Sequence, residues 1–188
     1  MRSDGVLEYN ATFVVPEKFA DLPRLGVTLE LPKELFNIDY FGNGPFENYN
    51  DRSAAATMGL YKTTPQEMYT PYIMPQENGN RTGVEFLSFR NSEGNGLLIA
   101  TPGEINFSAL PYSVLDLWES THTCDLNEGE SIYLNIDLFQ RGVGTGSCGP
   151  ITRPEYMVHP GRYKFTLLFA PISKDEDTAG TARAILNS

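Results

Sequence analysis

Residues 163–169 place an apolar side chain at every second position, and this repeat constrains the fold of the chain more than any other feature. Tyr163, Phe165, Leu167 and Phe169 share one parity along the segment. A two-residue repeat puts all four side chains on the same face of a β-strand. We therefore predict a strand at 163–169 with this face against a hydrophobic core.

Similar short runs of β-branched and aromatic residues recur along the chain, separated by Gly, Pro and Asn, which is typical of an all-β protein with many short strands. The sequence predicts an antiparallel β-sandwich. The expected strands are Val6 to Val15, Leu25 to Leu31, Ile38 to Phe41, Ala54 to Tyr61, Thr82 to Phe89, Leu97 to Ala100, Ile132 to Leu138 and Tyr163 to Phe169.

Helix is expected only in short connecting segments. Pro65 to Met68 follows Thr64, a residue suited to cap a helix N-terminus, and Tyr112 to Trp118 follows Pro111. From Ser173 onward the chain becomes small and polar and loses the two-residue repeat. We interpret residues 173–188 as an exposed polar tail.

Composition and charge exclude several functions. The chain of 188 residues has 40% hydrophobic and 12% aromatic residues, which is enough for one folded domain. The net charge of −10 repels nucleic acid, so no nucleic-acid partner is expected. No apolar run approaches the roughly 18 residues of a membrane helix, so no membrane partner is expected either. We also expect no secretion signal at the N-terminus of the chain.

The cysteines and histidines predict no metal site. Cys124 and Cys148 could form one disulfide at most, and His122 and His159 lie at spacings that do not fit a zinc finger. The cellular compartment therefore stays undecided, with the cytoplasm or periplasm of a bacterium as the alternatives.

Several carboxylates stand in unusual local sequences. Glu47, Asp51 and Arg52 lie in the segment GPFENYNDR, Glu77, Asn78 and Arg81 lie in MPQENGNR, and Asp137 lies in LNIDLFQRG. A retaining glycosidase needs two carboxyl groups about 5 Å apart, and the sequence shows no such pair. We interpret these carboxylates as structural groups that hold loops through nearby Arg and Asn residues.

Six segments, in the same order, resemble the C-terminal domain of the family 2 β-galactosidases. They are LPRLGVTLELP (22–32), YFGNGPFENYNDR (40–52), MYTPYIMPQENGNRTGVE (68–85), INFSALPYSVLDLWESTH (105–122), YLNIDLFQRGVGTGSCGP (133–150) and PGRYKFTLLFAP (160–171). The resemblance implies a β-supersandwich related to the galactose mutarotase fold, of which residues 1–172 would be the C-terminal part.

The resemblance also implies which parts of the enzyme lie elsewhere. In the family the two catalytic glutamates and the magnesium and sodium sites belong to a separate barrel domain, and no residue here matches them. We therefore expect no catalytic residue and no cofactor in this chain. The implied partners are the chain's own catalytic barrel domain, a galactoside substrate bound by the intact enzyme, and further copies in a homo-oligomeric parent.

One substrate-binding loop carries over by resemblance. In the family the loop after the strand that matches residues 132–138 reaches the mouth of the active site, and in some members it presents a tryptophan to the sugar. The matching position here is Cys148, which has no ring to stack. Its expected loop neighbours are Gly144, Thr145, Gly146 and Ser147. A loop ordered only in the presence of the barrel is the alternative.

Two other functions stay open. A carbohydrate-binding module would use Trp118, Tyr69 and Tyr72 as a sugar platform, but Leu115 and Leu117 beside Trp118 favour burial of the tryptophan. A mutarotase-like epimerase would need His122 or His159 in its groove. The free strand edges of a partial sandwich also predict a tendency to dimerise.

Overall fold

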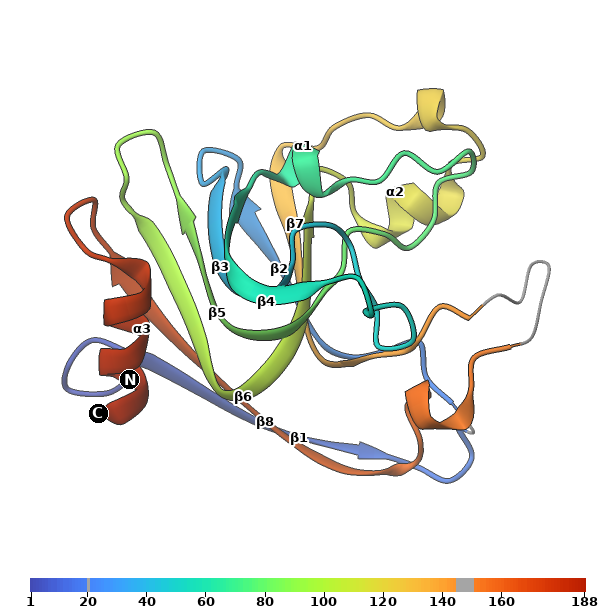
Figure 1. Cartoon of the computed structure of the whole chain (residues 1–188), viewed down its shortest axis with the longest axis horizontal. Helices are drawn as coiled ribbons and strands as arrows, with labels where there is room; N and C mark the ends of the chain where they lie inside the picture. The colour runs from blue at the N-terminus through green and yellow to red at the C-terminus, as the bar shows by residue number, and fades with distance from the viewer. Residues whose placement is uncertain (20, 145–150) are drawn as a thin grey trace.

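The computed structural model describes residues 1–19, 21–144 and 151–188 and confirms an all-β, antiparallel, sandwich-like fold (Figure 1). Within these residues the strands are β1 (Leu7–Val15), β2 (Arg24–Pro32), β3 (Asn37–Gly44), β4 (Thr57–Thr63), β5 (Arg81–Arg90), β6 (Gly96–Leu110), β7 (Ser131–Gln140) and β8 (Gly161–Ile172). The helices are α1 (Pro65–Met68), α2 (Val114–Glu119) and α3 (Thr178–Asn187), with 3-10 turns at Thr123–Asp125 and Pro154–Tyr156. No helix in the described residues is both long and apolar enough to cross a membrane.

The long strand β6 joins two sections of the sheet. One path of strands runs β1-β8-β6-β5-β3-β4, and β7 with its neighbour β2 branches from β6. The first half of β6, Gly96 to Ala100, pairs with β8, whereas the second half, Asn106 to Leu110, pairs with β7. Strand β5 pairs along both halves, with register shifts on either side of Val84. These shifts let β5 follow the change of direction in β6.

The bend in β6 lies at Pro102, Gly103 and Glu104, which are exposed between two buried halves. Proline removes a backbone donor from the ladder, and glycine has no side chain to pack, so the sheet is weakest in pairing at this point. The two halves of the strand can therefore diverge. The strand predicted at Leu97 to Ala100 covers only the first half of β6, because exposed residues 102–104 interrupt the apolar pattern.

The main core lies inside the curve of the sheet. Its largest fully buried side chains include Tyr40, Phe89 and Phe107, which come from three neighbouring strands. Phe165 and Leu167 are buried in the same core. The alternation that predicted the strand at 163–169 is thereby confirmed on its core-facing side.

The interpretation of residues 173–188 as an exposed polar tail is wrong. They contain α3, which begins after the N-cap Asp177 and packs on the outer face of the sheet (Figure 1). Ala182 is fully buried there and Ile185 is 8% exposed, in a cluster with Leu98 and Leu168. Arg90 fixes the approach to the helix by donating to the carbonyl oxygens of residues 173 and 176. Small side chains such as Ala182 can fill the contact between helix and sheet because the helix lies close to the sheet.

The two connecting helices are confirmed, but the predicted burial of Trp118 is wrong. Thr64 caps α1 by accepting a hydrogen bond from the amide of Glu67, and Ser113 forms a capping box with Asp116 at the start of α2. Leu117 is the buried side chain of α2, whereas Trp118 is 83% exposed. Adjacent residues of a helix point about 100° apart, so burial of Leu117 turns Trp118 toward solvent.

The packing of α3 on the sheet predicts that charged substitutions at two alanines of this helix differ in their effect on stability. Ala182→Glu should lower the free energy of unfolding by roughly 3–5 kcal/mol, because it forces an unpaired charge into the cluster under the helix. Ala184→Glu, on the exposed face, should change it by less than about 0.5 kcal/mol. Urea denaturation followed by circular dichroism measures both, and equal values would show that α3 is not docked.

Candidate functional site

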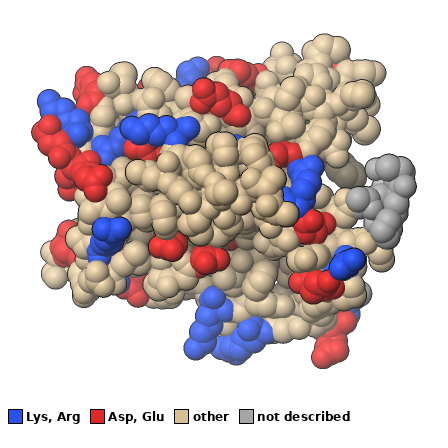
Figure 2. Space-filling model, in the orientation of Figure 1, with Lys and Arg blue, Asp and Glu red and all other residues tan. Residues whose placement is uncertain are grey.

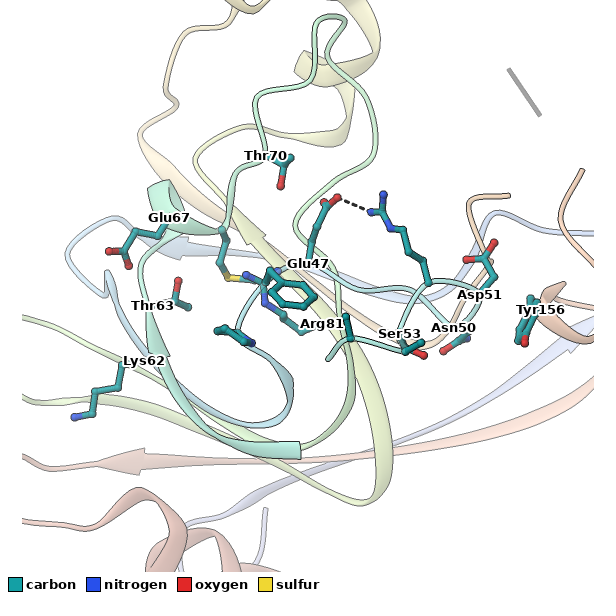
Figure 3. A pocket seen from close by; sticks show the side chains of 16 residues that line it. Glu47, Asn50, Asp51, Ser53, Lys62, Thr63, Glu67, Thr70, Arg81 and Tyr156 are labelled. Atoms are coloured by element: carbon teal, nitrogen blue, oxygen red, sulfur yellow. Dashed lines mark hydrogen bonds and ion pairs between the residues drawn. The ribbon is translucent and has the colours of Figure 1, made fainter. Parts of the chain in front are cut away.

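Glu47 joins three segments of chain at one end of the sheet. Its carboxylate accepts hydrogen bonds from the Arg52 guanidinium at 2.5 Å, from the amide of Gly79 at 2.8 Å and from the Tyr72 hydroxyl. In Figure 3 the dashed line at Glu47 marks its ion pair with Arg52. With three donors directed at it, the carboxylate holds the loops together and is not free to attack a substrate.

Asp51 holds the chain where it leaves β7. Its two carboxylate oxygens accept from the amides of Val143, at 3.1 Å, and Gly144, at 2.7 Å. Gly144 has a φ of +62°, a conformation that favours glycine. A Cβ on Gly142 would lie 2.6 Å from the Asp51 carboxyl carbon, so the close approach requires glycine there as well. Asp51 thus fixes the chain after β7 as far as Gly144.

A second charged group lies at the base of the same loops. Arg24 contacts Asp137 at 2.5 Å and Glu77 at 3.5 Å. A bulge between Leu25 and Gly26, together with the missing side chain of Gly26, lets β2 approach Asp137 this closely. Asp137 is 1% exposed, so its charge is stabilised through Arg24 rather than by water.

Burial is the largest cause of the pKa shifts of Asp137 and Glu77. It raises the pKa of Asp137 above its ordinary value, and the Arg24 guanidinium only partly offsets this effect. Burial likewise raises the pKa of Glu77, with Arg24 again acting in the opposite direction. The Glu77 side chain is still 32% exposed and accepts from the Tyr49 hydroxyl at 3.3 Å. It reaches a small cavity of about 350 Å³ beside Tyr49, Tyr72 and Gly144.

Asn78 and Arg81 organise the segment between α1 and β5. Asn78 is buried, accepts from the amide of Thr70 at 3.1 Å and donates to the carbonyl of Gln76 at 2.9 Å. Arg81 is also buried and donates to backbone carbonyl oxygens of its own turn. Both side chains thereby satisfy backbone groups that the turn leaves without partners.

The described residues bring the predicted carboxylates together but show no catalytic pair. Glu47, Asp51 and Glu77 each have an arginine or backbone amide as partner, and no group of three His, Cys, Asp or Glu suited to a metal occurs in residues 1–19, 21–144 and 151–188. His122 and His159 are exposed, on separate turns. The predicted loop residues Thr145, Gly146, Ser147 and Cys148 lie outside the described residues.

Sequence reasoning missed two members of this site. Arg24 lies more than a hundred residues from Asp137, and nothing in a single sequence indicates that they meet. Asn48 is fully buried, accepts from both the amide and the hydroxyl of Thr82, and donates to the carbonyl of Phe46. An asparagine between two loop-forming residues carries no signal that would distinguish this role from an exposed turn.

Comparison with known proteins decides the family. Residues 1–169 match the family model described as "Beta galactosidase small chain". The chain belongs to the β-galactosidase small chain family. Proteins named β-galactosidase are similar to it in Actinobacillus pleuropneumoniae (32% identical over 169 residues), Vibrio vulnificus strain CMCP6 (34% over 177 residues) and Priestia megaterium (31% over 172 residues).

These relatives are much longer than the chain. The matches cover 89%, 93% and 90% of this chain but only 16%, 16% and 17% of the Actinobacillus, Vibrio and Priestia proteins. The chain therefore corresponds to a small part of a β-galactosidase. The resemblance stated from the six segments is confirmed at the level of the family.

The raised pKa of Glu77 predicts how stability depends on pH. Its folded pKa lies above the ordinary value of 4.5, so the folded protein binds more protons than the unfolded chain between these two values. The stabilisation linked to Glu77 is fully present below pH 4.5 and is lost as pH rises through the folded pKa. Glu77→Gln should remove this part of the pH dependence while keeping the contact with Tyr49.

Urea denaturation of both proteins at a series of pH values between about 4 and 8 measures the effect. The difference in unfolding free energy, variant minus wild type, should increase toward high pH. Glu93→Gln, on an exposed turn, is the matched control. A difference that is constant across the series would contradict the predicted role of Glu77.

Proposed function

We propose that the chain is a non-catalytic C-terminal domain of a β-galactosidase that hydrolyses terminal β-D-galactosides such as lactose. The match to the small chain family, together with the 16% share of the Vibrio relative that the chain spans, carries this proposal. The hydrogen bonds of the carboxylates support it, because Glu47 is bound to Arg52 and Asp51 to the amide of Gly144, and both hold loops. On its own the chain is expected to be inactive.

We further propose that residues 145–148 contribute to the rim of the substrate pocket. The support is the construction at the base of this loop, where Asp51 fixes the amides of Val143 and Gly144. Asp51 is half-buried, and functional residues are often carried on loops that a folded framework positions. A loop held at its base can place Cys148 reproducibly when the barrel is present.

An exposed apolar surface on α2 and the neighbouring loop is the proposed contact with the catalytic barrel domain. Trp118 and Leu115 are 83% and 60% exposed on α2, and Ile73 is 95% exposed on the loop after α1. The Thr123 hydroxyl donates to the carbonyl of Tyr72 at 3.2 Å, which ties the two segments together at the same end of the molecule (Figure 1). Large apolar side chains that are exposed on two linked segments support a binding surface at this end of the molecule.

Magnesium and sodium would bind in the barrel of the parent enzyme and not in this chain. The parent is proposed to be a homo-oligomer. Strands β1, β2 and β4 each have one edge without a partner strand in the described residues, so backbone donors and acceptors are free for pairing. Missing strands of the parent domain or a second copy could cover these edges.

The exposure of Trp118 also favours a second candidate, a self-standing carbohydrate-binding module. Its other proposed platform residues are engaged elsewhere, since Tyr69 packs edge-on against Tyr112 at 5.0 Å and Tyr72 donates to Glu47. A sugar platform needs ring faces that are free together. Only Trp118 meets this requirement, so the docking role is preferred. An epimerase is not favoured, because His122 and His159 are exposed and lie on separate turns of the described chain.

A chimeric enzyme tests the proposed function. The portion of the Vibrio vulnificus β-galactosidase that matches this chain would be replaced by the chain itself, and hydrolysis of a chromogenic β-galactoside would be measured. The chimera should be active, and the isolated chain should not. Asp51→Ala in the chimera should lower kcat/KM roughly 10- to 100-fold, because it releases the base of the rim loop.

Asp175→Ala, at an exposed position, is the matched control and should leave kcat/KM unchanged. Hydrolysis by the isolated chain, abolished by exchanging one of its own carboxylates, would refute the non-catalytic role. An active chimera that is insensitive to Asp51→Ala would refute the rim loop but keep the domain assignment.

The docking surface predicts a separate behaviour for Trp118. Trp118→Arg should change the unfolding free energy of the isolated chain by less than about 0.5 kcal/mol, because the side chain is exposed. In the chimera the same change should reduce the yield of active enzyme, since it places a charge in an apolar contact. Fluorescence of Trp118 in the isolated chain, quenched freely by iodide, checks its exposure. An unaffected chimera would contradict docking through this surface.

A further inference from the structure

Arg81 is a buried arginine without an acidic partner. Its side chain is 3% exposed, and no carboxylate lies within 4 Å of it in the described residues. The Nε atom donates to the Tyr40 hydroxyl at 3.2 Å, and Nη1 donates to the carbonyl oxygens of Gly79 and Asn80 at 3.0 and 3.2 Å. All these acceptors are neutral. Buried arginine is normally paired with an anion, so the positive charge of Arg81 is left uncompensated.

Arg81 lies on the wall of a cavity with a volume of about 1160 Å³. In the view of Figure 3 Arg81 lies below Glu47, with Thr63 on one side and Ser53 on the other. No described residue accepts a hydrogen bond from the remaining terminal nitrogen, Nη2. Arg81 therefore keeps donor capacity for a group that enters the cavity.

The other charges around the cavity do not neutralise Arg81. Glu47 is paired with Arg52, and Asp51 accepts from two backbone amides on the far side. Lys62 on β4 lies on the rim and is paired with Asp39 at 3.8 Å, and Glu67 on α1 lies on the same rim. Phe46 and Met68 add apolar surface to the lining. An entering group would meet a mixed polar and apolar lining and one guanidinium without an ion-pair partner in the described residues.

The rim of the cavity is formed partly by β4, a strand that pairs only with β3. Lys62 and Thr63 at the end of β4 line the cavity, and Met58 and Leu60 are 46% and 55% exposed along the same strand. In Figure 2 the middle of this face is largely free of charged residues, which lie around its margin. An edge strand with free backbone groups and exposed apolar side chains accepts an added strand.

We infer that this surface binds an extended segment of the parent enzyme that pairs with the edge of β4 and places an acidic side chain on Arg81. This inference rests on the proposed function, because the segment belongs to the part of the β-galactosidase outside this chain. The relatives supply ample sequence, since the chain spans only 16% of the Vibrio protein. The positive charge of Arg81 is the reason to expect an acidic side chain on the bound segment. The free edge of β4 is the reason to expect that the segment is extended.

Peptide titrations of the isolated chain test the inference. The probe is acetyl-Val-Thr-Glu-Val-Thr-amide, and its matched control carries Gln in place of Glu. Nitrogen-15 NMR would follow the Nε–H signal of Arg81 and the amides of Thr57–Thr63. The glutamate peptide should shift both sets of signals saturably. The glutamine peptide should bind about 10-fold more weakly, because a charge-assisted hydrogen bond to the guanidinium is lost.

Arg81→Met should abolish the preference for glutamate, whereas Arg153→Met, at an exposed position with the same change of charge, should keep it. If Arg81→Met does not fold, the comparison of the two peptides on the wild-type chain still decides. Equal affinity for both peptides, shifts that map away from Arg81 and β4, or no saturable shift at millimolar peptide would each overturn the inference.

The outcome is separable from that of the proposed function. An inactive chimera would refute the proposed function while leaving the peptide preference to be measured on the isolated chain. An active chimera with no glutamate preference would refute only the role of Arg81 and β4.

Discussion

The structure depends on the pairing of β6 with three other strands. Its first half completes the section that contains β8, and its second half completes the section that contains β7. Because both faces of each half are buried, the strand connects the main core with the smaller cluster under α3. The bend at Pro102 and Gly103 lets one strand serve both sections. The position of β7, and with it the loop that leaves β7, follows from this bend.

Charged side chains at the end of β7 hold the neighbouring strand and loops in place. Arg24 reaches Asp137 across the β2–β7 pair, and Asp51 fixes the amides that follow β7. Buried ion pairs contribute little net stability, but removal of one partner is costly, so such groups fix geometry more than they add energy. Arg81 differs from Arg24, because it is buried without an acidic partner among the described residues. The carboxylates of this region thus hold loops, which agrees with the place of the chain as a small part of a larger glycosidase family member.

Much of the fold could be predicted from sequence, because two-residue alternation is a local signal. Each observed strand was expected, and the strand at 163–169 was placed on the correct face. The second half of β6 was missed, since Pro102-Gly103 ends most strands. Helix α3 was missed because its buried side chains, such as Ala182, are small. Such residues give no clear apolar repeat in the sequence, and their burial is seen only once the helix is packed on the sheet. Glu47 and Asp51 were found from their neighbours, whereas Arg24 could not be, because its partner is distant in sequence.

The central claim is that this chain supports a substrate site completed elsewhere and does not bind the sugar by itself. Saturation-transfer NMR of the isolated chain with lactose tests it most directly, with sucrose as the control sugar. The account predicts no transfer to the protons of either sugar, because the proposed substrate pocket would form only in the intact enzyme. Transfer that saturates with lactose and is absent with sucrose would contradict the account and show that the chain has a galactoside site of its own.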